Sequence, residues 1–316
     1  MLVFHTELLL ATRPTLAAHA PVADGAVMGH ILETWTPRGL SALDLPREDL
    51  PVWQGYLVDG GRAYFAPDDG RLLLVRTTQD DWLMWLHELH VHLLGGDPGK
   101  EVLGIAGWIA LGLLVSGVVM WWPKRGKLLR SLAWHRGPPA RRWLSWHRSS
   151  GVLLLPLLGL ATLTGLGMVY SAGFRSVIVA ALGANPPPVA AAATLEETDW
   201  PALLAAAQAA AGDGRLARVA LPGPDQPAIT FRYQAAGEWH PVGRSLVSLD
   251  RDGDTVLLRH DATADAPGAR LSNAIYPLHI GAVGGDTVRW LLVATGVLPA
   301  FLLATGFLFW RRRRGR

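Results

Sequence analysis

The hydrophobic positions of this chain are concentrated in three long apolar runs. The runs cover residues 102–122, 151–170 and 290–310, and none of them contains a charged residue. A helix needs about 20 mainly apolar residues to cross the hydrocarbon core of a bilayer. The pattern therefore predicts three membrane-spanning helices, which agrees with a composition of 50% hydrophobic and 17% charged residues.

Turn signals and short β-like runs occur in two segments outside these apolar runs, residues 11–80 and 194–270. Each segment contains a hairpin pattern with an Asp-Gly turn, at 62–76 and at 248–258. The second segment also contains a predicted helix at 196–211, so it reads as a small α+β module. Its predicted strands lie around 217–221, 228–233 and 245–249.

The first and third apolar runs are preceded by two copies of one pattern. A Leu-His pair ending at His90 is followed by Gly-Gly-Asp at 95–97, and a pair ending at His279 is followed at the same spacing by 284–286. Copies of a helical unit in one membrane protein usually pack as neighbours. We therefore expect His90 and His279 at one depth on facing helices, as the axial ligand pair of a haem iron.

The cations indicate the orientation in the membrane. Residues 123–150 carry eight Lys and Arg and no Asp or Glu, and residues 311–316 carry five Arg. Cytoplasmic segments of membrane proteins are rich in cations, so both are predicted to be cytoplasmic, and residues 11–100 and 171–289 periplasmic. These clusters account for the basic net charge without a nucleic-acid partner. Cysteine is absent, which excludes disulfides and iron–sulfur clusters.

The N-terminal residues 1–10, MLVFHTELLL, read as the tail of a membrane helix. No charged region, complete apolar span or cleavage site precedes them, yet the segment 11–100 must be carried across the membrane. We infer that a first spanning helix is missing from the sequence. The alternative is a short apolar N-terminus that packs on the outer domain.

A family resemblance rests on three stretches: LHELHVHLLGGDPGKEVLGIAGWIALGLLVSGVVMWWPKR, WLSWHRSSGVLLLPLLGLATLTGL and YPLHIGAVGGDTVRWLLVATGVLPAFLLATGFLFWRRRR. Together they resemble the PepSY-associated transmembrane family of bacterial inner-membrane proteins, which includes iron-regulated dihaem reductases of ferric siderophores. The resemblance covers nearly the whole chain and implies a four-helix bundle with periplasmic α+β PepSY-like modules. The first helix of that bundle, with a His near its cytoplasmic end, would be the missing one.

The resemblance implies haem b as the cofactor, with His90 and His279 ligating an outer haem. His147 would ligate a second, inner haem, which is expected only when the missing helix supplies the other His. The implied partners are membrane lipid, a cytoplasmic electron donor and a periplasmic ferric chelate as acceptor. The implied reaction is electron transfer across the membrane for ferric-siderophore reduction.

The expected segments follow from these assignments. They are a helix tail (1–10), a first PepSY-like module (11–80), an amphipathic and a spanning helix (81–122), a basic loop (123–150), a second span (151–170), a linker (171–193), a second PepSY-like module (194–270), a His-bearing segment with the third span (271–310) and a basic tail (311–316).

Three other interpretations remain open. The chain is alternatively a non-enzymatic PepSY membrane sensor or peptidase-modulating protein, which needs no haem. His87 and His90 are three residues apart and are able to share a copper or zinc ion. A metal transporter is disfavoured because the apolar runs lack the acidic residues that usually line a conducting path.

Overall fold

The computed structural model describes residues 2–122, 127–184, 198–222, 228–250 and 255–314. The chain forms two compact units. The sheet unit comprises residues 2–94 and 174–274, and the helical unit comprises residues 95–173 and 275–316. The predicted Asp-Gly turn of the second hairpin and much of the predicted linker lie outside the described residues.

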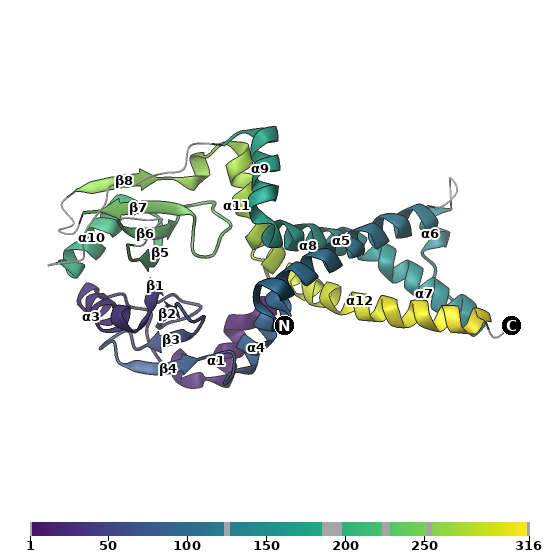
Figure 1. Ribbon diagram of the computed structural model, residues 1–316, viewed down its shortest axis with the longest axis horizontal. Helices are drawn as coiled ribbons and strands as arrows, with labels where there is room; N and C mark the ends of the chain where they lie inside the picture. Colours follow the sequence, from purple (N-terminus) through teal and green to yellow (C-terminus); the bar gives the residue numbers. More distant parts are fainter. Residues whose placement is uncertain (1, 123–126, 185–197, 223–227, 251–254, 315–316) are drawn as a thin grey trace. The chain divides into compact units, whose positions relative to one another are not determined.

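The sheet unit is built on eight antiparallel strands in the order β4-β3-β2-β1-β5-β6-β7-β8 (Figure 1). The strands are β1 (Leu40–Asp44), β2 (Trp53–Leu57), β3 (Arg62–Phe65), β4 (Leu72–Arg76), β5 (Arg215–Ala220), β6 (Ile229–Gln234), β7 (Ser245–Leu249) and β8 (Val256–His260). Both predicted hairpins are present, as β3/β4 and β7/β8. Gly70 adopts a φ of +70° in the first turn, a conformation that glycine adopts without steric cost.

The two predicted modules form one sheet instead of two separate ones. β1 pairs with β5, and Asp44 lies directly opposite Arg218. Asp44 is 1% exposed, and its carboxylate accepts hydrogen bonds from Arg218 and, at 3.0 Å, from the Tyr56 hydroxyl. The two modules, 11–80 and 194–270, thus join edge to edge, because each alone would leave an edge strand with unpaired backbone groups.

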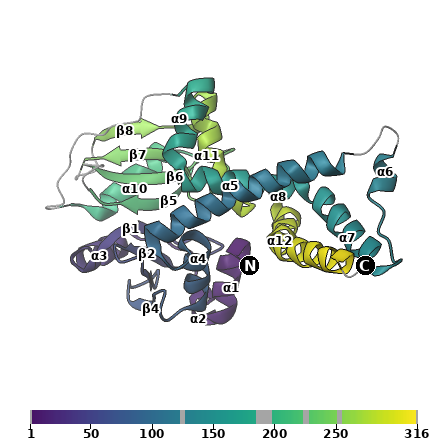
Figure 2. The ribbon, with the colours of Figure 1, turned by 45° about the vertical axis from the view of Figure 1, so that its right-hand side comes forward.

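Two helices cover the same face of this sheet, α3 (Gly25–Trp35) and α10 (Trp200–Ala211) (Figure 2). Each begins at an aspartate cap: Asp24 accepts from the Ala26 amide at 2.8 Å, and Asp199 accepts from the Ala202 amide at 3.0 Å. The large side chains of the core beneath them include Trp53, Phe65, Trp200, Phe231 and Tyr233.

The N-terminal segment packs within the sheet unit. It forms η1 (Leu2–Phe4), α1 (His5–Thr12) and α2 (Pro14–Ala17), and with α4 (Trp82–His92) it encloses a second small core. That core contains Leu9, Leu16, Leu50, Val52, Tyr64 and Leu83. This packing is the alternative that the sequence left open for residues 1–10, and the helix expected ahead of them remains a prediction.

Two helices of the helical unit are long and apolar enough to span a membrane, α5 (Gly96–Trp121) and α12 (Gly285–Arg314). Both begin at the repeated glycine, and Gly96 and Gly285 have positive φ angles of +58° and +65°. The sequence repeat is thus also a structural repeat. α5 exposes many apolar side chains, including Ile105, Trp108, Ile109, Leu113 and Met120, as a lipid-facing helix does.

The third predicted span is a broken helix. α7 (Pro139–Leu153) and α8 (Leu155–Val169) differ in direction by 62°, with the break at Leu154. Only the two helices together are long and apolar enough to cross a membrane. Pro156 has no amide hydrogen to continue the helical hydrogen bonds, which explains the break. Two corrections follow: helix begins at Pro139, inside the predicted basic loop, and the span is not straight.

Three further helices complete the fold: α6 (Leu128–Ser131), α9 (Ser171–Leu182) and α11 (Pro267–Ile280). α9 occupies the start of the predicted linker, where a run of Val, Ile and Ala favours regular structure over an open loop. Within the helical unit α12 packs along both α7 and α8, and α5 packs along α8. The second and third predicted spans therefore lie side by side.

Candidate functional site

His279 contacts a threonine of a neighbouring helix. It lies near the end of α11, half-buried, and its Nδ1 atom is 3.0 Å from Oγ1 of Thr164 on α8. The next residue, Gly165, has no side chain, and a Cβ atom there would lie 3.4 Å from Cε1 of the imidazole. Thr164 thus forms a hydrogen bond with the imidazole, and the missing side chain at Gly165 leaves space for the ring.

His147 has the same kind of neighbour on a different helix. It lies on α7, and its Nδ1 atom is 3.0 Å from the carbonyl oxygen of Leu302 and 3.3 Å from Oγ1 of Thr305, both on α12. A Cβ atom at Gly306 would lie 3.4 Å from the same Nδ1. A Thr-Gly pair again flanks a half-buried imidazole.

The hydrogen bonds place the proton of His147 on Nδ1. A carbonyl oxygen can only accept, so the Leu302 carbonyl takes its hydrogen from Nδ1–H of His147 and leaves the lone pair on Nε2, the form that binds a metal. At His279 the only hydrogen of the Thr164 hydroxyl has two acceptors within reach, the Leu160 carbonyl at 2.7 Å and Nδ1 at 3.0 Å. When this hydroxyl donates to the carbonyl, its oxygen accepts from Nδ1–H and His279 has the same tautomer as His147.

The two contacts cross between the same pair of helical segments. His279, at the end of α11 and before α12, contacts Thr164 on α8. In the opposite direction, His147 on α7 contacts Thr305 on α12. His279 lies just before α12 begins, whereas His147 faces the last third of that helix. The helical unit therefore holds one oriented imidazole at each end.

His90 belongs to the sheet unit, where it lies two residues before the end of α4. Its side chain is exposed, although neighbouring protein atoms lower its pKa by desolvation. His279 belongs to the helical unit. Pairing of His90 with His279 on one iron therefore stays a prediction.

Helix α4 is anchored firmly at its start. Asp81 caps it, accepting from the Leu83 and Met84 amides at 2.9 and 3.1 Å. The same carboxylate is bound by two nitrogens of the buried Arg76 at 2.7 and 2.9 Å, and Arg76 also donates to the Tyr64 hydroxyl at 2.9 Å. These bonds lower the pKa of Asp81 against the opposing effect of burial. The helix that carries His90 is thus fixed to β4.

Another histidine of α4, His92, pairs with a glutamate of the same helix. Nδ1 of His92 lies 2.9 Å from Glu88 Oε1, which is an ordinary pair of residues four apart on a helix. In the part of the chain that the structure describes, no three His, Asp or Glu side chains gather as a metal site. The two-histidine copper or zinc interpretation for His87 and His90 is not tested by this.

Comparison with known families identifies the architecture as a whole. The model of the family described as PepSY-associated TM region matches residues 1–313. The chain belongs to this family. A comparison with curated proteins gave no match. The PepSY-associated TM assignment agrees with a helical membrane protein that also carries a sheet domain.

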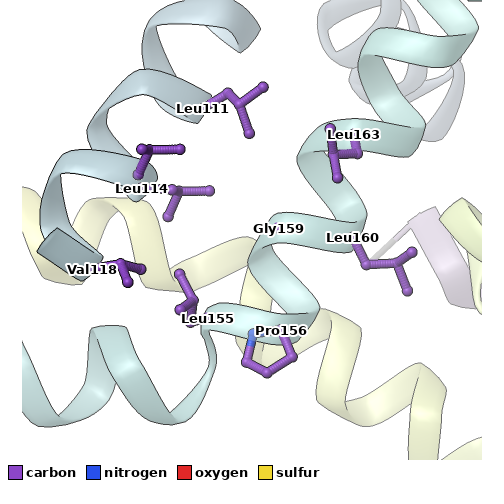
Figure 3. A pocket seen from close by; sticks show the side chains of 9 residues that line it. Leu111, Leu114, Val118, Leu155, Pro156, Gly159, Leu160 and Leu163 are labelled. Atoms are coloured by element: carbon purple, nitrogen blue, oxygen red, sulfur yellow. The ribbon is translucent and has the colours of Figure 1, made fainter. Parts of the chain in front are cut away.

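An open apolar hollow of about 420 Å³ lies between α5 and α8 in this PepSY-associated TM fold (Figure 3). Leucines of both helices point into it, and Pro156 and Gly159 form its α8 wall. Its lining residues include no histidine. The residues of α8 that contact His279, Thr164 and Gly165, do not line this hollow.

A second hollow, of about 510 Å³, is lined by cations. Arg130, Arg141 and Arg148 surround it together with His135. The stretch from residue 102 to residue 195, which includes all three arginines, contains no Asp or Glu. The cytoplasmic location expected for this positive charge stays a prediction.

The threonines at the two imidazoles were not predicted from the sequence. The available signal was the Thr-Gly dipeptide, which occurs at both positions and also at Thr295-Gly296. Which dipeptide faces a histidine depends on helix packing, so the dipeptide alone does not single out the two.

Proposed function

We propose that the protein is a b-type haem protein of the bacterial inner membrane that carries electrons to a periplasmic ferric chelate. The single observation that supports this most is the matching environment of His279 and His147. The Nδ1 atom of each lies beside a threonine hydroxyl of a neighbouring helix, at 3.0 and 3.3 Å. Metal-ligating histidines usually have their second nitrogen bound in this way.

The proposal assigns a haem to each of two levels of the helical unit. His279, with His90 of the sheet unit, would hold an outer haem, and His147 would hold an inner one. When bound, the haem supplies one-electron redox chemistry. The chain holds the imidazole orientation through Thr164, Thr305 and the Leu302 carbonyl.

Iron with two imidazole ligands has no open position, so the acceptor needs only to approach the haem edge. We infer that the sheet unit serves as the periplasmic receiving surface. A ferric siderophore is the proposed acceptor because reduction weakens the hold of hard oxygen ligands on iron.

The experiment starts with the protein purified from membranes in the ferric and the dithionite-reduced state. We expect a reduced-minus-oxidised difference spectrum of low-spin b haem, and reoxidation of the reduced form when a ferric chelate is added. A spectrum without haem would overturn the proposal and favour the sensor or peptidase-modulating interpretation, which needs no cofactor.

A further inference from the structure

Two arginines of the sheet unit face each other on neighbouring strands. Arg218 on β5 is the direct cross-strand partner of Arg232 on β6. Like charges at directly opposite positions destabilise a sheet. This pair lies in the middle of the eight strands, where a repulsive contact is costly unless a negative group offsets it.

The carboxylate that acts on Arg232, that of Asp44, is also bound by other groups. Asp44 pairs with Arg218 and with Arg47 (3.5 Å), and accepts from the Tyr56 hydroxyl. Within the described residues the Arg232 guanidinium makes no hydrogen bond or ion pair. It is half-buried and therefore also lacks full hydration.

Glu238 does not supply the missing charge to Arg232 either. Its carboxylate accepts from the backbone amides of Ala235 and Arg244, at 2.8 and 2.7 Å, and from the Ser245 hydroxyl at 3.0 Å. Its role is to hold the turn between β6 and β7.

The positive field at Arg232 affects its neighbours. Burial, followed by Arg244 and Arg218, lowers the pKa of Arg232 to about 10. Burial, followed by Arg244, Arg232 and Arg218, lowers the pKa of His240 to about 3. Three guanidinium groups therefore act on one small region of the sheet.

This region is on the face opposite α3 and α10. Phe231 and Tyr233, which flank Arg232 along β6, belong to the core beneath those helices. Side chains alternate between the two faces of a strand, so Arg232 points to the other face.

We propose that Arg232, with Arg218 and Arg244 beside it, binds the anionic oxygen groups of a metal chelate. This rests on the proposed function and names its substrate class, a chelate with net negative charge. Guanidinium groups suit this task because their planar donors bind carboxylates in pairs. Binding would offset the repulsion between Arg218 and Arg232.

The test measures binding of citrate, with and without iron, to the full-length protein in detergent by calorimetry. Arg232→Gln should weaken binding at least about tenfold, the value of a charge-assisted hydrogen bond. Arg259→Gln is the matched control. Arg259 is an exposed arginine of β8, and its cross-strand partner on β7 is the core residue Val247. Equal affinity in the wild type and Arg232→Gln would overturn the site.

Thermal unfolding in buffer without citrate gives a second, independent readout. Arg232→Gln should keep or raise the midpoint, because it removes a repulsion, and a clearly lower midpoint would contradict the proposal.

Uncharged tris(maltolato)iron(III) should bind equally to both forms, whereas a loss of its binding in Arg232→Gln would contradict recognition by charge. Binding of iron-free citrate requires no haem. A protein that binds citrate but contains no haem would therefore refute the proposed function and leave the arginine site standing.

Discussion

Nδ1 of His279 lies 3.0 Å from Oγ1 of Thr164, across the contact between α11 and α8. The Thr164 hydroxyl also lies 2.7 Å from the Leu160 carbonyl of its own helix. The orientation of a candidate metal ligand is thus set by a helix more than 100 residues away in sequence.

Thr164→Val should remove this hydrogen-bond partner of His279 while keeping the size of the side chain. We expect haem affinity to fall by about 10- to 100-fold, the usual cost of losing a hydrogen bond that orients a metal ligand. The haem-to-protein ratio after haem titration measures this. Thr162→Val is the matched control, because Thr162 lies on the same helix and bonds only the Leu158 carbonyl in the described structure. Equal loss in both variants would show a general packing effect.

Thr305→Val should perturb His147 less than Thr164→Val perturbs His279. The reason is that Nδ1 of His147 keeps a second acceptor, the Leu302 carbonyl at 3.0 Å. A suitable measurement is the NMR tautomer signal of the ¹⁵N-labelled imidazole of His147, which should stay in the Nδ1–H form. Thr295→Val, a buried threonine on the same helix, is the control. A switch of tautomer in Thr305→Val would contradict the assignment.

Asp81→Ala should destabilise the sheet unit strongly. It leaves Arg76, which is 1% exposed, without its carboxylate and removes the cap of α4. Breaking a buried ion pair costs about 3–5 kcal/mol, and the loss should appear as a lower midpoint of unfolding monitored by circular dichroism. Asp69→Ala removes an exposed pair with Arg71 and should cost less than about 1 kcal/mol. A small effect of Asp81→Ala would refute the anchoring of α4.

His240 should make the sheet unit sensitive to acid. Burial and three arginines lower its pKa from 6.5 to about 3. The unfolded chain takes up a proton near pH 6.5 but the folded chain does not, so stability falls as the pH is lowered from 6.5 toward 3. The midpoint of thermal unfolding should drop between about pH 7 and pH 4.5, and His240→Gln should reduce this drop. The exposed His30→Gln is the control, and an unchanged slope in His240→Gln would contradict the assignment.

The sequence was sufficient for local structure and insufficient for long-range pairing. The hairpin of residues 62–76 and the glycine starts of α5 and α12 follow from turn chemistry and apolar periodicity, which are local. Pairing of β1 with β5 joins strands about 175 residues apart and depends on Asp44 meeting Arg218, which no local pattern encodes. The bend at Leu154 was readable from Pro156, but a single proline inside an apolar run does not always break it.

The histidine contacts follow the same division. His90, His147 and His279 were identified from the repeat and the family resemblance, whereas Thr164 and Thr305 depend on how α8 and α12 are rotated against their neighbours. Rotation of a helix within a bundle is set by packing, and an apolar run with hydrophobic residues on all sides does not specify it.

The most direct test of the account is the haem content of His279→Ala and His90→Ala beside His30→Ala, each purified from membranes at the same protein concentration. We expect the first two variants to lose the low-spin b-haem absorption of the outer site and His30→Ala to keep it. Full haem absorption in His279→Ala, or none in the unmodified protein, would contradict the claim that these histidines hold a haem.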